Sequence, residues 1–217
     1  MKKNPIYIAI INTEITPNNE SINLVYKWYK EINDNCKFLK EAKIINTKNI
    51  DKETFFNLIK DLIGKGRTSC CFYICEHGKQ IEKENKDEGY EEYLKLNQNN
   101  YIKDIEFTNF INSLNIINKY IIMEVCHSGG LINEIKCDTN FEIPKNSLII
   151  SLCSKDEKCY YRTIYKDGKP YTYCYFSIFF AQGNINPLKE PLKALDLLKR
   201  NKKYNIHPKL ILVNEDY

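Results

Sequence analysis

Six short runs of this sequence are almost wholly apolar and rich in β-branched and aromatic residues. A strand with one solvated face alternates apolar and polar residues, so a run without alternation indicates a strand buried on both faces. Stretches with the spacing of amphipathic helices separate these runs. The predicted strands are residues 6–12, 42–45, 69–75, 120–125, 147–153 and 209–213. The pattern therefore predicts a three-layer α/β fold, in which helices cover both faces of a mostly parallel central sheet of about six strands.

Three segments between the predicted strands have apolar residues at helical spacing. The clearest is 51–63, where Asp51 is a suitable N-cap and Gly64 a suitable helix end. Its apolar stripe consists of Phe55, Leu58, Ile59 and Leu62. Residues 104–114 and the segment after Pro191 have a similar stripe. Such stripes are typical of core packing, so we give these helices no functional role.

The composition is that of one globular domain, which we predict to span residues 1–217. Hydrophobic residues make up 43% and charged residues 28%, which excludes extended disorder. The net charge of +4 is spread along the chain without a dense run of Lys and Arg, so we do not expect a nucleic-acid partner. The apolar run at 6–11 is too short for a secretory signal, and nothing elsewhere is long enough to span a membrane. We therefore expect a cytoplasmic protein without a membrane partner.

The chain contains nine scattered cysteines. Cys70, Cys71 and Cys75 fall within one predicted buried strand, whereas the disulfides of small secreted domains join loops. This distribution indicates a reducing compartment. The sequence contains no Cys-x-x-Cys pair, and its three histidines are far apart, so we expect neither a metal ion nor another cofactor.

Two irregular segments, 79–92 and 131–146, follow the third and fourth predicted strands. The first is dense in Lys and Glu, which favours a solvated loop. If the two strands are parallel, both segments leave the sheet at the same edge. Proteins of the α/β class place their sites at the carboxyl ends of parallel strands. We therefore expect the functional site at this edge.

The residues at these two strand ends carry the chemistry. The third strand leads into His77-Gly78, and the fourth leads into Cys126. In parallel neighbouring strands His77 and Cys126 emerge side by side, which suits a thiol nucleophile and the imidazole that takes its proton. Gly78 permits a close backbone approach to a substrate, and the amides of Gly78 and Cys126 can form an oxyanion hole. The sequence thus predicts a catalytic His77–Cys126 dyad, with Gly78 in substrate binding.

The run Glu-Val-Cys-His-Ser-Gly-Gly at 124–130 resembles the Asp-x-Cys-His-Ser-Gly of metacaspases, and its Glu-x-Cys is similar to that of legumain. Further along, 151–157 resembles the fifth-strand segment of the family, and 168–172 resembles the Gly-x-x-Phe-Thr opening of the following helix. His77 precedes Cys126 by 49 residues, close to the spacing of about 50 in caspases. The likeness spans residues 6–213. It implies a caspase-like fold and peptidase activity from the His77–Cys126 dyad.

The sequence departs from this family in two places. Metacaspases have an Asn-Asp pair after the first strand, whose acid helps to line the specificity pocket, and no counterpart can be placed here. Caspases have Gln-Ala-Cys where this chain has Glu124-Val125-Cys126. Cleavage after aspartate is therefore not expected.

Glu124 is the basis of the predicted specificity. It lies two residues before Cys126, so strand alternation places it on the same face, toward the pocket floor. A desolvated carboxylate needs a partner, and a Lys or Arg side chain of a substrate supplies one. Asp156, after the fifth strand, is expected to add a second negative charge. If Arg67 or Arg162 pairs with Glu124 instead, the pocket suits asparagine, as in legumain.

The predicted function is that of a cysteine endopeptidase that cleaves protein or peptide substrates after Lys or Arg. The alternative is a caspase-fold protein that binds or scaffolds without turnover. A cysteine-dependent phosphatase needs an arginine six residues after the cysteine, where this chain has Ile132. A serine hydrolase needs Gly-x-Ser-x-Gly, which does not occur. We interpret His127, His207 and Glu76 as structural, since Glu76 should face the opposite side of its strand.

Overall fold

The structure is a computed structural model of residues 1–217. The structure describes residues 5–11, 20–32, 42–64, 67, 69–83, 89–126, 147–151, 153, 161–166, 168–174, 180, 183–200 and 209–213.

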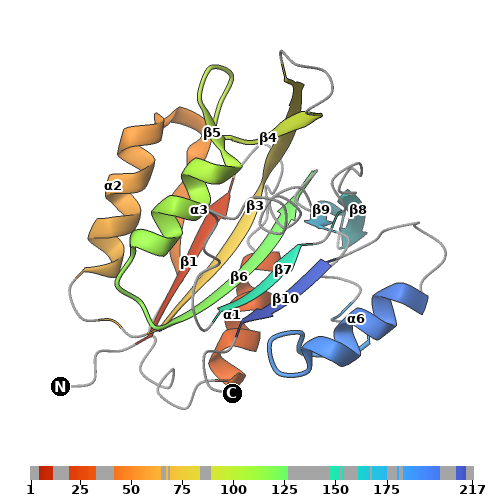
Figure 1. The fold of residues 1–217 in the computed structure, drawn as a ribbon. Helices are drawn as coiled ribbons and strands as arrows, with labels where there is room; N and C mark the ends of the chain where they lie inside the picture. Colours follow the sequence, from red (N-terminus) through yellow and green to blue (C-terminus); the bar gives the residue numbers. More distant parts are fainter. Residues whose placement is uncertain are drawn as a thin grey trace.

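The central sheet has the strand order β10-β7-β6-β3-β1-β2 in the described part of the chain (Figure 1). Every neighbouring pair in it is parallel except β10 and β7, which are antiparallel. Its strands are β1 (Ile6–Ile11), β2 (Lys43–Asn46), β3 (Ser69–Glu82), β6 (Asn118–Val125), β7 (Ser147–Ser151) and β10 (Lys209–Val213). The predicted mostly parallel sheet is confirmed, and its strands lie within a few residues of the predicted ranges, except that β3 is longer.

Helices cover both faces of this sheet, which gives the predicted three layers (Figure 1). On one face, α1 (Glu20–Ile32) packs Ile22, Val25 and Trp28 against the sheet, and Ala194 of α6 (Pro191–Arg200) joins the same core. On the other face lie α2 (Lys52–Ile63) and α3 (Asp104–Ser113). We call these the α1 face and the α2–α3 face.

Local sequence sets the ends of α2 as predicted. The Asp51 side chain accepts a hydrogen bond from the Thr54 amide at 2.7 Å, which satisfies one of the open donors of the first turn. This bond to the amide lowers the pKa of Asp51. At the other end Gly64 has a φ of 57°, a conformation that glycine adopts without strain.

The segment 79–92 is not the predicted solvated loop. β3 continues to Glu82 and pairs antiparallel with β4 (Tyr90–Lys95), which in turn pairs with β5 (Tyr101–Lys103). Only one face of this small sheet is buried, so every second position is free to carry a charge. Lys79 of β3 and Glu91 of β4 occupy such positions.

Three further elements were not predicted. Helix α1 was missed, and so was the antiparallel pair β8 (Tyr161–Lys166) and β9 (Lys169–Cys174). The expected helix opening at 168–172 is wrong, because Gly168 is a turn residue with a φ of 72° and β9 begins directly after it. The segment 131–146 lies outside the described residues.

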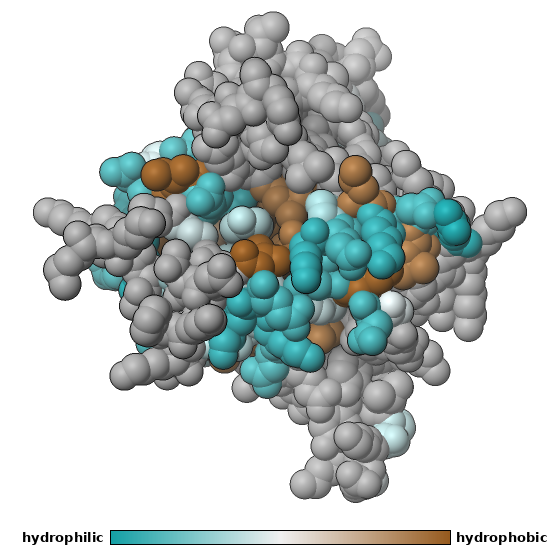
Figure 2. All heavy atoms as spheres, turned by 90° about the horizontal axis from the view of Figure 1, so that it is seen from below, coloured by the Kyte–Doolittle hydropathy of each residue, from teal (hydrophilic) through white to brown (hydrophobic). Residues whose placement is uncertain are grey.

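No helix among the described residues is both long and apolar enough to cross a membrane. Figure 2 shows the molecule from below. Among the described residues on this face, hydrophilic side chains surround small groups of hydrophobic ones.

Candidate functional site

The two strands that carry the predicted dyad are parallel neighbours. Cys75 of β3 pairs with Glu124 of β6, and Glu76 pairs with Val125. His77 and Cys126 follow directly after this last pair, and strand alternation would place them on the same face of the sheet. The parallel pairing of the two strands is confirmed, whereas the contact between the two side chains stays a prediction. His77 does not end its strand, however, because β3 continues past it.

The backbones of Gly78 and Cys126 are in close contact. A Cβ atom added to Gly78 would lie 2.8 Å from the carbonyl carbon of Cys126, nearer still to its oxygen, and 3.0 Å from a methyl group of Val125. No side chain fits in that space, so position 78 requires glycine. Gly78 does permit a close approach, but its neighbour is Cys126 itself.

Cys126 differs from four other cysteines in its access to solvent. None of the five forms a disulfide, and Cys126 is partly exposed, whereas Cys70, Cys71, Cys75 and Cys153 are buried. Burial raises the pKa of the Cys70 thiol well above its usual range, which keeps that sulfur protonated. His77, across from Cys126, is exposed. Both positions are therefore at least partly accessible to solvent.

Glu124 lies on the α1 face of the sheet, beside Tyr73, and not at the surface. Its side chain is fully buried and accepts a hydrogen bond from the Tyr73 hydroxyl. The Glu124 carboxylate also acts on Tyr7 of β1. Burial is the main reason that the pKa of Tyr7 lies well above its usual range, and charge interactions with Cys71 and Glu124 raise it further. The prediction that Glu124 touches a substrate side chain therefore does not fit this geometry.

Tyr73 is a site residue that the sequence analysis missed. The pairing of Cys75 with Glu124 places Tyr73 one step back on the same face of β3, within reach of the carboxylate. Strand register would have pointed to it, but register depends on knowing which strands are neighbours. Tyrosine in a buried strand also passes for ordinary core.

Glu76 lies on the opposite face from His77, as predicted, and is fully buried. Its carboxylate accepts hydrogen bonds from the Thr47 hydroxyl and, at 3.2 Å, from the backbone N–H of His77. The Thr47 hydroxyl also lies 3.2 Å from the carbonyl oxygen of Ile11, at the end of β1. These bonds hold the backbone at His77 against the neighbouring strand end.

The remaining predicted site residue, Asp156, lies outside the described residues, as does the segment 127–146 that follows Cys126. Arg67, a suggested partner for Glu124, donates to the carbonyl of Ile63 at 2.9 Å. Within the described part of the chain, no three His, Cys, Asp or Glu side chains are grouped closely enough to hold a metal ion.

No model of a known protein family matches this sequence, and no curated protein matches it significantly. Among solved structures, the chain is similar to protein GSU0716 from Geobacter sulfurreducens, with a TM-score of 0.59. The similarity covers 98% of this chain and 94% of that one, at 12% sequence identity. At that identity the likeness concerns the fold alone, and it supports a three-layer α/β/α architecture over nearly the whole length of both proteins.

Proposed function

We propose that this protein is a cysteine endopeptidase in which Cys126 is the nucleophile and His77 the general base. The main support for the proposal is the parallel pairing of β3 with β6. Their pairing ends at Glu76 and Val125, immediately before His77 and Cys126, and Gly78 packs directly on the Cys126 backbone. The caspase-like sequence motifs at the same two positions support the same assignment.

The chemistry assigned to these residues is acyl transfer. The His77 imidazole takes the proton from the Cys126 Sγ, and the thiolate attacks the carbonyl carbon of the scissile peptide bond. The resulting oxyanion accepts hydrogen bonds from the backbone amides of Gly78 and Cys126. The imidazolium then gives its proton to the leaving amine, and water hydrolyses the thioester to regenerate the thiol.

The residue preference stays a prediction. Cleavage after Lys or Arg was inferred from Glu124, whose carboxylate is buried and accepts from Tyr73. We therefore assign Glu124 a structural role. Its hydrogen bond with Tyr73 links β6 to β3 just below Cys126. Asp156 remains the residue proposed to attract a basic substrate side chain, and asparagine remains the alternative.

The test is cleavage of blocked peptides that differ only at the residue before the scissile bond, with Arg, Lys, Asn and Asp compared. We expect turnover by the wild-type chain and a loss of about 10³-fold or more in kcat/KM for Cys126→Ala and for His77→Ala. Cys153→Ala is the matched control, because that thiol is buried in the core. Circular dichroism and the melting temperature establish that each variant is folded.

Retained turnover in folded Cys126→Ala would refute the assignment of the nucleophile. A folded wild-type chain that cleaves none of the peptides would favour the alternative, a binding or scaffold protein with the same fold. A strong preference for Asp would contradict an acidic pocket.

A further inference from the structure

The antiparallel extension of the sheet presents an outward face that begins at His77. Pairing of β3, β4 and β5 sets His77, Lys95 and Tyr101 in one row. The next row on the same face contains Lys79, Tyr93 and Lys103. We call the five residues other than His77 the hairpin face.

Side-chain contacts confirm that these residues share one face. The Lys79 ammonium lies 5.1 Å from the centre of the Tyr101 ring, and the Lys103 ammonium lies 5.9 Å from that of Tyr93. The two rings meet edge to face, with centroids 6.3 Å apart. Cation–π contacts of this kind hold lysines in place while their charge stays available.

The reverse side of the same strands is covered. Leu94 of β4 and Ile102 of β5 are buried in the core of the α2–α3 face. Lys79, in contrast, is exposed. The hairpin face is therefore the solvent side of this small sheet, continuous with the candidate catalytic histidine.

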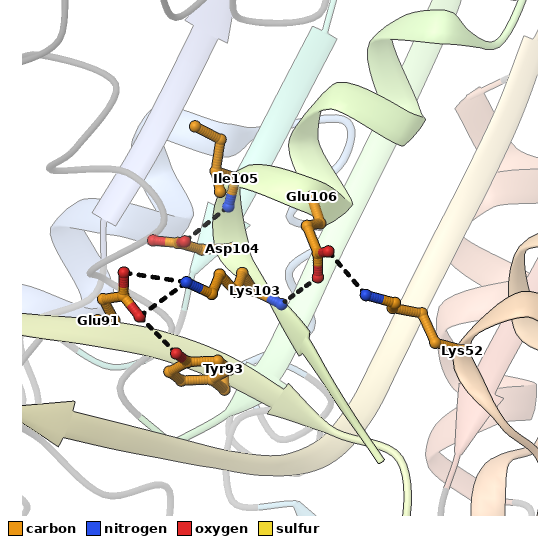
Figure 3. Close-up of polar contacts among 7 residues, drawn as sticks. All are labelled: Lys52, Glu91, Tyr93, Lys103, Asp104, Ile105 and Glu106. Atoms are coloured by element: carbon orange, nitrogen blue, oxygen red, sulfur yellow. Dashed lines mark hydrogen bonds and ion pairs between the residues drawn. The ribbon is translucent and has the colours of Figure 1, made fainter.

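Positive charge prevails on the hairpin face. Glu91, on the same side of β4, pairs with Lys103 at 3.0 Å and accepts from the Tyr93 hydroxyl (Figure 3). The hydrogen bond from Tyr93, followed by that from Lys103, lowers the pKa of Glu91, so this acid is ionised and neutralises Lys103. Within the described part of the chain, Lys79 and Lys95 take part in no ion pair, so their two positive charges remain uncompensated.

We propose that the hairpin face binds an acidic segment of the protein substrate, next to the bond that is cleaved. This inference rests on the proposed function, because it is the proximity to His77 that makes the bound segment a substrate. Lys95 and Lys79 stand in successive rows, about 7 Å apart along the strands. An extended peptide presents alternate side chains at the same interval, so two carboxylates at positions i and i+2 can meet the two ammonium groups.

A single-stranded nucleic acid is the other ligand that lysines and tyrosines commonly bind, through phosphate contacts and base stacking. The two rings of this face are approached by Lys79 and Lys103 and by each other. Their surfaces are thus already used in cation–π and edge-to-face contacts. This geometry favours carboxylates over bases.

Binding is measured first in the Cys126→Ala protein, where cleavage cannot interfere. The probe is a fluorescein-labelled peptide with Glu at alternate positions, compared by fluorescence anisotropy with the same peptide carrying Gln. We expect at least tenfold tighter binding of the Glu peptide, weakened by salt. Lys79→Glu combined with Lys95→Glu should remove this advantage, and the corresponding pair of Gln substitutions should reduce it.

The control is Lys27→Glu combined with Lys189→Glu, which makes the same change in net charge at two exposed lysines outside the hairpin. Equal loss of affinity in the control, equal binding of the two peptides, or tighter binding of an oligonucleotide of equal charge would each overturn the docking site.

With the active protein, an acidic flanking segment should lower the KM of a cleavable peptide without changing kcat. An unchanged KM would count against the proposal. Selective binding on the hairpin face without any turnover would leave the docking site standing and overturn the peptidase assignment alone.

Discussion

The two halves of β3 belong to one continuous strand but lie in opposite surroundings. From Ser69 to Glu76 every residue is buried, between parallel neighbours β1 and β6. From His77 to Glu82 the strand pairs antiparallel with β4, and its side chains are exposed or partly exposed. The backbone passes from one half to the other without a break, as a single strand of 14 residues.

The difference shows how one strand can hold the backbone of a residue such as His77 in place and still leave its side chain exposed to solvent. The first half is held by packing on both faces, so its position is set by the core. The second half is held on one face only and leaves the other to solvent. The proposed catalytic residue, His77, is the first residue of the second half. Its backbone is therefore held by the rigid first half, while its side chain is exposed to solvent.

The largest loss of stability and activity should come from Gly78→Ala, which changes a residue at the junction between the two halves of β3. A Cβ atom at this position would overlap the Cys126 carbonyl, so one strand end must shift. We expect a loss of about 1–3 kcal/mol in the free energy of unfolding. We also expect a fall of about 100-fold in kcat/KM, because His77 and Cys126 move apart. Urea denaturation and peptide cleavage measure the two effects.

Ile81→Ala is the control for this substitution, since Ile81 is 40% exposed in the outer half of the same strand. It should change the free energy of unfolding by no more than about 0.5 kcal/mol and leave kcat unchanged. If Gly78→Ala behaves like the control, the close contact between Gly78 and Cys126 is not part of the native state.

A difference in stability alone, without the loss of activity expected for Gly78→Ala, should separate Tyr73→Phe from Tyr93→Phe, the same substitution in the two surroundings. Each removes a hydroxyl that donates to a glutamate, Glu124 in the core and Glu91 on the hairpin. Loss of a donor to a buried carboxylate should lower the free energy of unfolding by about 1–3 kcal/mol. On the hairpin, solvent and Lys103 replace the lost bond, so we expect less than about 0.5 kcal/mol.

Thermal or urea unfolding of both tyrosine variants is the measurement. Similar losses in the two variants would mean that Glu124 is reached by water, which would reopen the prediction that it contacts substrate.

Much of the parallel sheet could be predicted from the sequence because its strands are buried on both faces. The runs at 6–12, 69–75 and 120–125 have no polar alternation, which is typical of strands inside a covered parallel sheet. Asp51 and Gly64 likewise act at short range, so the ends of α2 were predicted correctly. Local signals of this kind do not depend on the rest of the chain.

The errors arose where tertiary pairing decides the structure. Residues 79–92 are rich in Lys and Glu, which are common both in loops and on the solvent face of a strand, and only the pairing of β3 with β4 distinguishes the two. In α1, Ile22, Val25 and Trp28 have helical spacing and could have been found. Glu124 is buried because the α1 face covers it and the Tyr73 hydroxyl donates to its carboxylate. Both partners are distant in the sequence, so a short motif around Cys126 does not predict this burial.

If His77 takes the proton of the Cys126 thiol, the pH dependence of Cys126 alkylation must change when His77 is replaced. Iodoacetamide labelling of each cysteine is followed by peptide mass spectrometry in the wild-type protein and in His77→Ala. We expect Cys126 to react faster than the buried Cys70, Cys71, Cys75 and Cys153 in the wild-type protein, and to react already below pH 7. In His77→Ala its reaction should require a pH near the ordinary thiol pKa of about 8.5. A pH profile of Cys126 that is the same in both proteins would contradict the dyad.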